Sequence, residues 1–198
     1  ESFLKNIDYT VIGSGIVGLT CALELRRLNP NSKIVILERG FLPTGASTKN
    51  AGFTCFGSPS ELLDDLSKSK ETDVFQLVEN RVNGLSKLRA LVGDANMDYK
   101  EYGSYELFDN PALYESCISQ LEYLNKQLHK TFNATTFQVF TNARAFGLDK
   151  NSLLIKNNFE GQINTGKMMK KLLLLLLFIP LFSFGQNTLE TKYILPEG

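Results

Sequence analysis

The feature that most constrains this chain is a run of three glycines placed between an apolar strand and an apolar helix. Residues 8–13 are β-rich and end in Gly13, which is typical of a buried strand followed by a tight turn. Residues 16–28 carry apolar side chains at helical spacing, and residues 29–32 end that helix with proline and polar turn formers. Residues 33–37 are almost wholly apolar and indicate a second strand. Two strands joined by one helix predict a right-handed βαβ unit with parallel strands.

The glycines follow the pattern G-x-G-x-x-G, which is weak evidence alone but informative between a strand and a helix. Gly13 allows the turn, Gly15 lets the backbone approach a pyrophosphate, and Gly18 lets the helix pack close to the strand. Free amides and the positive dipole end at the start of the helix favour the anion. The predicted pyrophosphate contacts are Gly13, Gly15, Ile16, Val17 and Gly18.

A carboxylate, Glu38, closes the second strand about 20 residues after the last glycine, where a ribose ligand is expected. It can accept hydrogen bonds from both ribose hydroxyls and would repel a 2′-phosphate, which disfavours NADP. FAD and NAD remain as alternatives. The loop over residues 44–53, rich in Gly, Ser, Thr and Asn, favours FAD, because NAD domains usually pass directly into the next helix.

Residues 8–19, 37–39 and 44–53 together resemble the FAD-dependent oxidoreductases of the D-amino-acid oxidase type. That family includes glycine oxidase-like and sarcosine oxidase-like enzymes, and hydroxyglutarate and glycerol-phosphate dehydrogenases. The resemblance implies that Arg39 joins Glu38 in holding the ADP half of FAD. It also implies cofactor contacts from Ser47, Thr48, Asn50, Ala51 and Gly52.

The implied activity is oxidation of a small amine, amino acid or 2-hydroxy acid by hydride transfer to the flavin. A non-catalytic module that binds FAD or NAD is the alternative, and a membrane-associated or exported protein is a third.

We expect an α/β fold, with a Rossmann-like FAD/NAD(P)-binding βαβ unit and a partial α+β substrate region. Residues 160–167 resemble the family's return to the flavin domain, but members are considerably longer. We therefore expect a truncated, inactive chain.

Residues 169–198 differ in character from the rest of the chain. A basic start at residues 169–171, an apolar run over residues 172–184 and small residues before position 186 are typical of a secretory signal peptide. The run is shorter than the about 20 residues that span a bilayer. We predict an incomplete FAD-binding domain over residues 1–168 and an unpacked, fused tail over 169–198. Only that tail suggests membrane or export, so we predict a cytoplasmic location.

The middle of the chain predicts alternating helices and short strands. Predicted helices cover residues 60–92, with Ser60 as cap and a break near residues 69–72, and residues 111–129. Predicted strands cover residues 101–108, 136–140 and 153–155, and residues 41–59 are predicted to be an irregular loop.

Composition excludes several other functions. The 21 basic and 21 acidic residues balance, which argues against a nucleic-acid partner. Cys21, Cys55 and Cys117 are too widely spaced for a zinc site or a redox dithiol, so we expect no metal and reduced, mostly buried thiols.

Isolated polar residues provide no catalytic candidate. His129, the only histidine, is predicted to be a surface residue, and Lys49 a solvated loop residue. Three tyrosines in an alternating stretch, Tyr99, Tyr102 and Tyr105, are predicted to belong to the core. The catalytic residues, substrate, electron acceptor and oligomeric state are not assigned.

Overall fold

A computed structural model describes residues 5–40 and 43–178, which fall into two compact units. The described part of the first unit comprises residues 5–40, 43–52, 95–98 and 164–178. The second unit comprises residues 53–94 and 99–163. Each unit has its own sheet and its own buried side chains.

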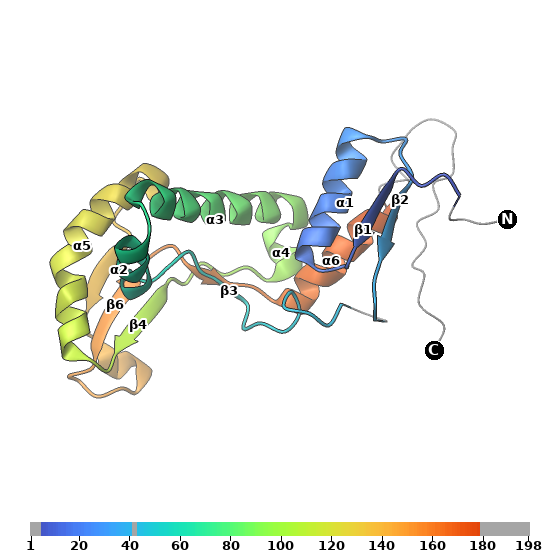
Figure 1. The fold of residues 1–198 in the computed structure, drawn as a ribbon. Helices are drawn as coiled ribbons and strands as arrows, with labels where there is room; N and C mark the ends of the chain where they lie inside the picture. The colour runs from blue at the N-terminus through green and yellow to red at the C-terminus, as the bar shows by residue number, and fades with distance from the viewer. Residues whose placement is uncertain (1–4, 41–42, 179–198) are drawn as a thin grey trace. The chain divides into compact units, whose positions relative to one another are not determined.

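The first unit is built on the predicted βαβ arrangement (Figure 1). Strand β1 (Tyr9–Ile12) and strand β2 (Ile34–Leu37) pair in parallel, with Tyr9 opposite Ile34 and Ile12 opposite Leu37. Helix α1 (Ile16–Leu28) connects them and buries Leu19, Ala22 and Leu23. The Rossmann-like start and the mixed α/β class predicted from the sequence are therefore confirmed.

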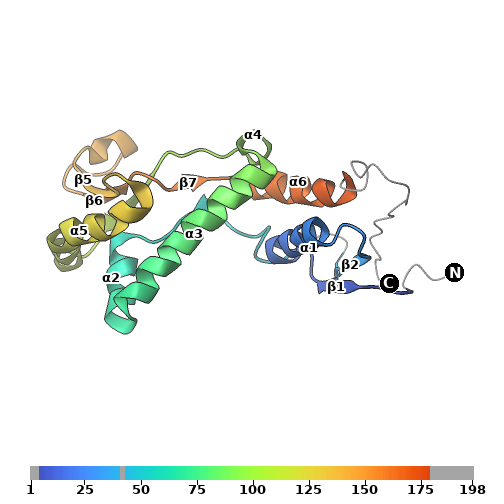
Figure 2. The same ribbon diagram turned by 90° about the horizontal axis from the view of Figure 1, so that it is seen from above.

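Helix α6 (Thr165–Phe178) contacts α1 in the same unit, and both views show the two helices side by side (Figures 1 and 2). Met168, Met169 and Leu172 are at most 3% exposed, and Leu176 is also buried. Their spacing places them on one helical face that continues across the predicted boundary after residue 168. The single-turn helix α4 (Asp94–Met97) adds buried Met97, whose carbonyl oxygen accepts a 2.7 Å hydrogen bond from the Asn164 N–H.

The prediction that the chain beyond residue 168 stays unpacked is thus wrong for residues 169–176. The apolar run that starts at Leu172 has a helical period, and this period gives α6 a face that is buried against α1. The fused origin of residues 169–198 stays a prediction, and residues 179–198 lie outside the described residues. Among the helices of residues 5–40 and 43–178, none has the length and apolar character needed to cross a membrane.

The second unit contains two small antiparallel sheets. Strand β3 (Phe53–Thr54) pairs with β7 (Gly161–Gln162). Strands β4 (Ser104–Phe108), β6 (Leu153–Asn157) and β5 (Phe137–Phe140) form the other sheet, in the order β4-β6-β5. The remaining elements are α2 (Pro59–Lys68), α3 (Glu71–Val92), α5 (Pro111–Phe132) and a 3₁₀ turn, η1 (Ala143–Phe146).

The core of the second unit lies between these helices and the three-stranded sheet. Its buried members include Leu62, Val78, Leu124, Phe137 and Ile155, each at most 1% exposed. They come from α2, α3, α5, β5 and β6, so the core joins segments that are far apart in the sequence.

Several predicted boundaries in the second unit differ from the structure, and α5 and β6 also run a few residues longer than predicted. Ser58, not Ser60, caps α2, in a capping box with Glu61, because Pro59 occupies the first helical position. The segment predicted to be irregular contains β3, which is too short to give a periodic signal. Strand β4 starts at Ser104, because Gly103, with a φ of +77°, ends the preceding turn.

The packing of α6 predicts a large cost for truncating its central leucine. Leu172→Ala should lower the free energy of unfolding by about 2–5 kcal/mol, because Leu172 is 0% exposed. Urea unfolding followed by far-UV circular dichroism measures this, with half-buried Leu174→Ala as the matched control. A change within about 0.5 kcal/mol for Leu172→Ala would show that α6 does not pack in solution.

Candidate dinucleotide-binding site

The turn between β1 and α1 requires glycine at two positions. Gly13 has a φ of +92°, which side chains rarely adopt, and its N–H donates a 2.7 Å hydrogen bond to the Leu37 carbonyl oxygen. A Cβ on Gly18 would run into the Gly13 carbonyl oxygen. The first turn of α1 is therefore held directly against the end of β1. Whether these residues contact a cofactor stays a prediction.

The start of α1 is capped from a distant loop. Gly15 is the N-cap and offers no side chain, and the Ile16 N–H donates to Ser47 Oγ at 2.9 Å. A Cβ on Gly15 would lie 3.1 Å from that oxygen, so a side chain there would push Ser47 back by a few tenths of an ångström. The first turn contains no acidic residue. The positive end of the helix dipole is thus left without a carboxylate from its own first turn, which suits an anionic ligand.

Glu38 lies just beyond β2 and is held by backbone and side-chain donors. Its Oε2 accepts hydrogen bonds from the Ser14 N–H at 2.8 Å and from the Ser14 hydroxyl at 2.7 Å. Its Oε1 accepts one from the Gly40 N–H at 3.1 Å. These hydrogen bonds lower the pKa of Glu38 to about 2. The Ser14 hydroxyl contributes most, and the N–H groups of Ser14 and Gly40 follow. The side chain is therefore a carboxylate at neutral pH.

The loop after β2 is braced by its own polar side chains. The Thr48 hydroxyl donates to the Pro43 carbonyl oxygen at 2.9 Å. The Asn50 amide donates to the Ala46 carbonyl oxygen and accepts from the Gly52 N–H, both at 2.8 Å. Exposed loop residues with no such bracing role are Arg39, Lys49 and Ala51. Of the predicted loop contacts, the structure brings only Ser47 to the glycine turn.

These groups fit the ADP part of a dinucleotide. A helix start whose first turn carries no acidic residue suits the pyrophosphate, and an ionised carboxylate at the adjacent strand end suits the ribose hydroxyls. The donors and the acceptor belong to the same unit and surround the same turn. The arrangement offers hydrogen-bond donors and an ionised acceptor that suit the binding and orientation of a dinucleotide.

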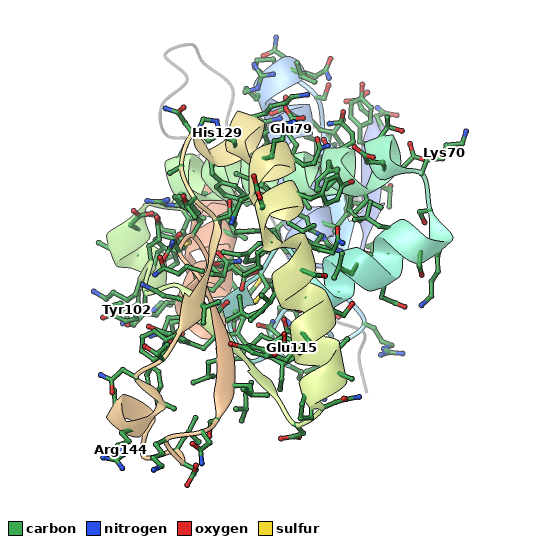
Figure 3. The ribbon with its side chains drawn as sticks, turned by 90° about the vertical axis from the view of Figure 1, so that its left-hand side faces the viewer. Lys70, Glu79, Tyr102, Glu115, His129 and Arg144 are labelled. Atoms are coloured by element: carbon green, nitrogen blue, oxygen red, sulfur yellow. The ribbon has the colours of Figure 1, made fainter. Side chains whose placement is uncertain are left out.

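A second concave region lies in the second unit and is lined by carboxylates and aromatic rings. Its volume is about 470 Å³, and Glu61, Glu106 and Glu160 line it together with Phe53 and Tyr102. Figure 3 shows Tyr102 at the edge of this unit. Glu160 is 3% exposed and accepts from the N–H groups of Phe56 and Gly57 and from the Ser104 hydroxyl. Carboxylates beside aromatic rings suit a cationic group.

The charges around this pocket also affect its thiol. Partial desolvation of its thiol, followed by the negative charge and hydrogen bonding of Glu160, raises the pKa of Cys55 to about 12, although the residue as a whole is exposed. Cys55 is therefore a neutral thiol, not a nucleophile, at neutral pH. Among the lining carboxylates, Glu106 accepts from the Ser60 hydroxyl and Glu160 from the Ser104 hydroxyl, so two of the three have serine hydroxyl donors.

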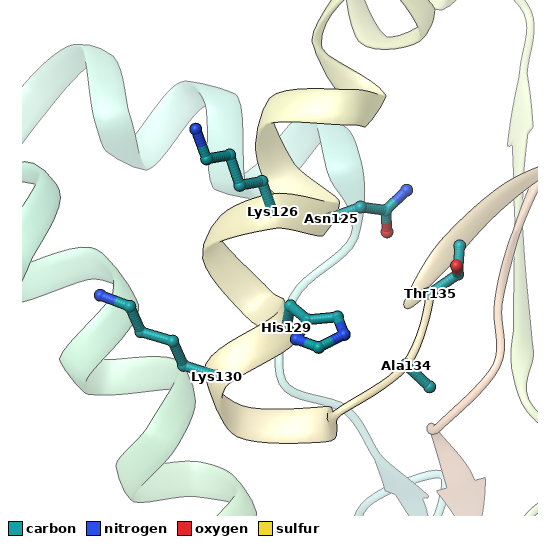
Figure 4. A pocket seen from close by; sticks show the side chains of 6 residues that line it. All are labelled: Asn125, Lys126, His129, Lys130, Ala134 and Thr135. Atoms are coloured by element: carbon teal, nitrogen blue, oxygen red, sulfur yellow. The ribbon is translucent and has the colours of Figure 1, made fainter.

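The other candidates from the sequence are dispersed. His129 is exposed beside a pocket of about 360 Å³, where its ring points toward Thr135 while Lys126 and Lys130 point away (Figure 4). Tyr99 is buried as predicted, but Tyr102 is 67% exposed, so its assignment to the core is wrong. Tyr105 is 36% exposed and lines the carboxylate pocket, so its assignment to the core is also wrong.

The cysteines are free thiols, and only Cys117 is buried, so the prediction of mostly buried cysteines is wrong. Cys21 lies on an outer face of α1, and Cys55 lies at the pocket. Among residues 5–40 and 43–178, no group of three or more His, Cys, Asp or Glu side chains could hold a metal ion.

Two important side chains were not found from the sequence. Ser14 fills a variable position of the glycine pattern, and only its small polar side chain hinted at a partner for Glu38. Glu160 had no signal of its own, because its partner Phe56 is 104 residues away.

The parallel βαβ unit, its glycine turn and its strand-end carboxylate have the architecture of a dinucleotide-binding protein. Residues 8–173 match the DAO family, described as FAD dependent oxidoreductase. The chain belongs to this family of FAD-dependent oxidoreductases.

Known proteins show how much of the family fold the chain covers. Thiamine thiazole synthase of Citrus sinensis is 26% identical over 157 residues, which is 78% of this chain and 36% of that protein. Iminodiacetate oxidase from a Chelativorans species superposes with a TM-score of 0.59 at 19% identity, covering 84% of this chain and 43% of that one. Glycine oxidase from Bacillus cereus gives 0.58 at 18% identity, with coverages of 84% and 43%. The chain spans less than half the length of these proteins.

The hydrogen bonds to Glu38 predict a pH dependence of folding stability. Because the pKa of Glu38 is lowered from 4.5 to about 2, its contribution is fully present above about pH 5 and is lost as the pH falls toward 2. The difference in unfolding free energy between the wild type and Glu38→Gln should therefore shrink between pH 5 and pH 3.

Urea unfolding at several pH values measures this difference. Glu115→Gln, at an exposed position of α5, is the control for the loss of one carboxylate charge. A difference that stays constant over this range would place Glu38 outside the observed hydrogen-bond network.

Proposed function

We propose that the chain binds FAD and forms the nucleotide-binding part of an oxidoreductase acting on an amine, amino acid or 2-hydroxy acid. The observation that carries this proposal is the glycine turn with Ser47 and ionised Glu38 in a chain of the FAD-dependent family. Bound flavin would supply the redox chemistry by taking a hydride from the substrate and passing electrons to an acceptor. The residues of this chain would bind and orient that cofactor.

The names of structural neighbours favour an amine or amino acid among the three substrate classes. Iminodiacetate oxidase, glycine oxidase and the L-amino acid deaminase of Proteus vulgaris all carry such substrates in their names. Their identities to this chain are 16–19%, a level at which the fold is shared but the substrate can differ.

In the proposed complex, Gly15 keeps a side chain away from the pyrophosphate, Gly13 and Gly18 allow the tight turn that places α1 there, and the start of α1 attracts the charge. Val17 supplies a backbone N–H group at that helix start, and Ile16 would supply its own only by exchanging the Ser47 hydroxyl for the pyrophosphate. Glu38 accepts a hydrogen bond from the adenosine ribose, and Arg39 lies next to it in the chain. Further contacts would come from the loop residues Ser47, Thr48, Asn50, Ala51 and Gly52.

A non-catalytic module that binds FAD or NAD is the second candidate. The same glycine turn and Glu38 would serve either dinucleotide. Flavin absorbance of the purified chain, with titrations of FAD, NAD and NADP, separates the two cofactors. Tight FAD binding supports the oxidoreductase, whereas preference for NAD supports the module and overturns the FAD proposal. The cytoplasmic location and the absence of a nucleic-acid partner stay predictions.

Gly15 should be indispensable for cofactor binding. Gly15→Val should leave far-UV circular dichroism unchanged and abolish stoichiometric FAD binding, because even a Cβ lies 3.1 Å from Ser47 Oγ and faces the anion's path. Flavin absorbance after gel filtration measures retention. Gly84→Val on α3 is the matched control, since a Cβ there meets no atom within 4 Å. Stoichiometric FAD in Gly15→Val would contradict the assigned role.

Turnover by the 198-residue chain alone is not expected. None of the described histidine, tyrosine or cysteine side chains is assigned as a catalytic acid or base, and a misplaced reacting group can cost about a hundredfold in rate. Mixing the FAD-loaded chain without oxygen with amines, D-amino acids and 2-hydroxy acids should leave the flavin absorbance unchanged. Substrate-dependent bleaching would contradict the predicted inactivity and place a complete reaction site within this chain.

A further inference from the structure

Ser14 directs both of its donors to one oxygen of Glu38. Its N–H and hydroxyl donate to Glu38 Oε2 at 2.8 and 2.7 Å, and the side chain is 1% exposed. A buried hydroxyl needs a partner, and here the partner is a charged group 24 residues away. The contact therefore connects the glycine turn with the end of β2.

The two oxygens of Glu38 are used unequally. A carboxylate has about four positions for accepting hydrogen bonds, two on each oxygen. On Oε2 both are taken by Ser14, whereas Oε1 has the longer 3.1 Å hydrogen bond from the Gly40 N–H, and the Arg39 N–H has the weakest influence of the donors that act on this carboxylate. The side chain of Glu38 is only half-buried. Oε1 is consequently the oxygen with capacity left for a ligand.

The hydroxyl of Ser14 donates a hydrogen bond to Glu38 that the backbone at position 14 cannot provide. Any residue except proline at position 14 could supply the N–H, but only a hydroxyl supplies the second donor. With the N–H alone, Oε2 would keep an open acceptor position and the carboxylate could rotate. The hydroxyl fixes the rotation and favours the ionised form of Glu38.

We infer that Ser14 is a positioning residue that locks Glu38 through Oε2 and thereby presents Oε1 to the ribose diol of the dinucleotide. The inference rests on the proposed function, because it needs a nucleotide ribose at Glu38. It assigns a role to a position that the glycine pattern leaves variable.

The test compares two nucleotides on the full chain by isothermal titration calorimetry. ADP carries the ribose diol, and 2′,3′-dideoxy-ADP lacks it. Ser14→Ala should weaken ADP binding about tenfold and dideoxy-ADP binding less than about twofold, because the lost contact acts only through the diol. Ser119→Ala on α5 is the matched control, since its hydroxyl donates only to the Ser116 carbonyl oxygen in the same helix.

A pH series provides a second readout. The ratio of ADP dissociation constants between Ser14→Ala and the wild type should rise as the pH falls from 7 to 4.5, because without its largest stabilising donor Glu38 protonates at higher pH. The titration of ADP itself cancels in this ratio. Ser14→Gly, which also removes the hydroxyl, is used if circular dichroism shows that Ser14→Ala does not fold.

Equal losses for ADP and dideoxy-ADP, with a ratio that does not change with pH, would show that Ser14 only supports the turn and would overturn the inference. The proposed FAD function would survive that result. Failure of the wild type to bind either FAD or ADP would overturn both. The two failures are therefore distinguishable.

Discussion

The contact between helix α1 and strand β1 at Gly18 is the constraint on which the candidate site depends. Because a Cβ there would meet the Gly13 carbonyl oxygen, the helix begins immediately beside the strand end. That closeness brings Ser14 within hydrogen-bond distance of Glu38 at the end of β2. The backbone turn, the helix dipole and the carboxylate are thus placed together by one steric condition rather than by separate contacts.

A second consequence is that the helix start is capped without being neutralised. The first N–H groups of an α-helix have no partner within the helix, and Ser47 satisfies that of Ile16 through a neutral hydroxyl. An acidic cap would satisfy the same N–H but would repel a phosphate. Glu38 is the nearby negative charge, and its Oε2 is held by Ser14. The same turn can therefore carry both a helix start that attracts an anion and an ionised carboxylate, Glu38, that suits a ribose.

Elements with a clear local periodicity could be predicted from the sequence. Elements that are very short, or that depend on contacts between distant residues, could not. The βαβ unit, α3 and α5 follow from apolar spacing and caps such as Asn110. Strands β3 and β7 have two residues each and exist only because they pair across the chain. Helix α6 was predicted wrongly because its apolar composition resembled an export signal, while its spacing already fitted a helix face buried against α1.

The two embedded carboxylates show why residue type alone does not identify a site. Glu160, like Glu38, accepts from backbone N–H groups and from a serine hydroxyl, and its partners are also far away in the sequence. Yet Glu160 is 3% exposed and both of its oxygens are engaged, so it mainly joins the segment after β3 to β4. Glu38 is half-buried and keeps capacity on Oε1. The uneven use of its two oxygens, and not the presence of a buried acid, therefore distinguishes Glu38 from Glu160, which holds segments of the fold together.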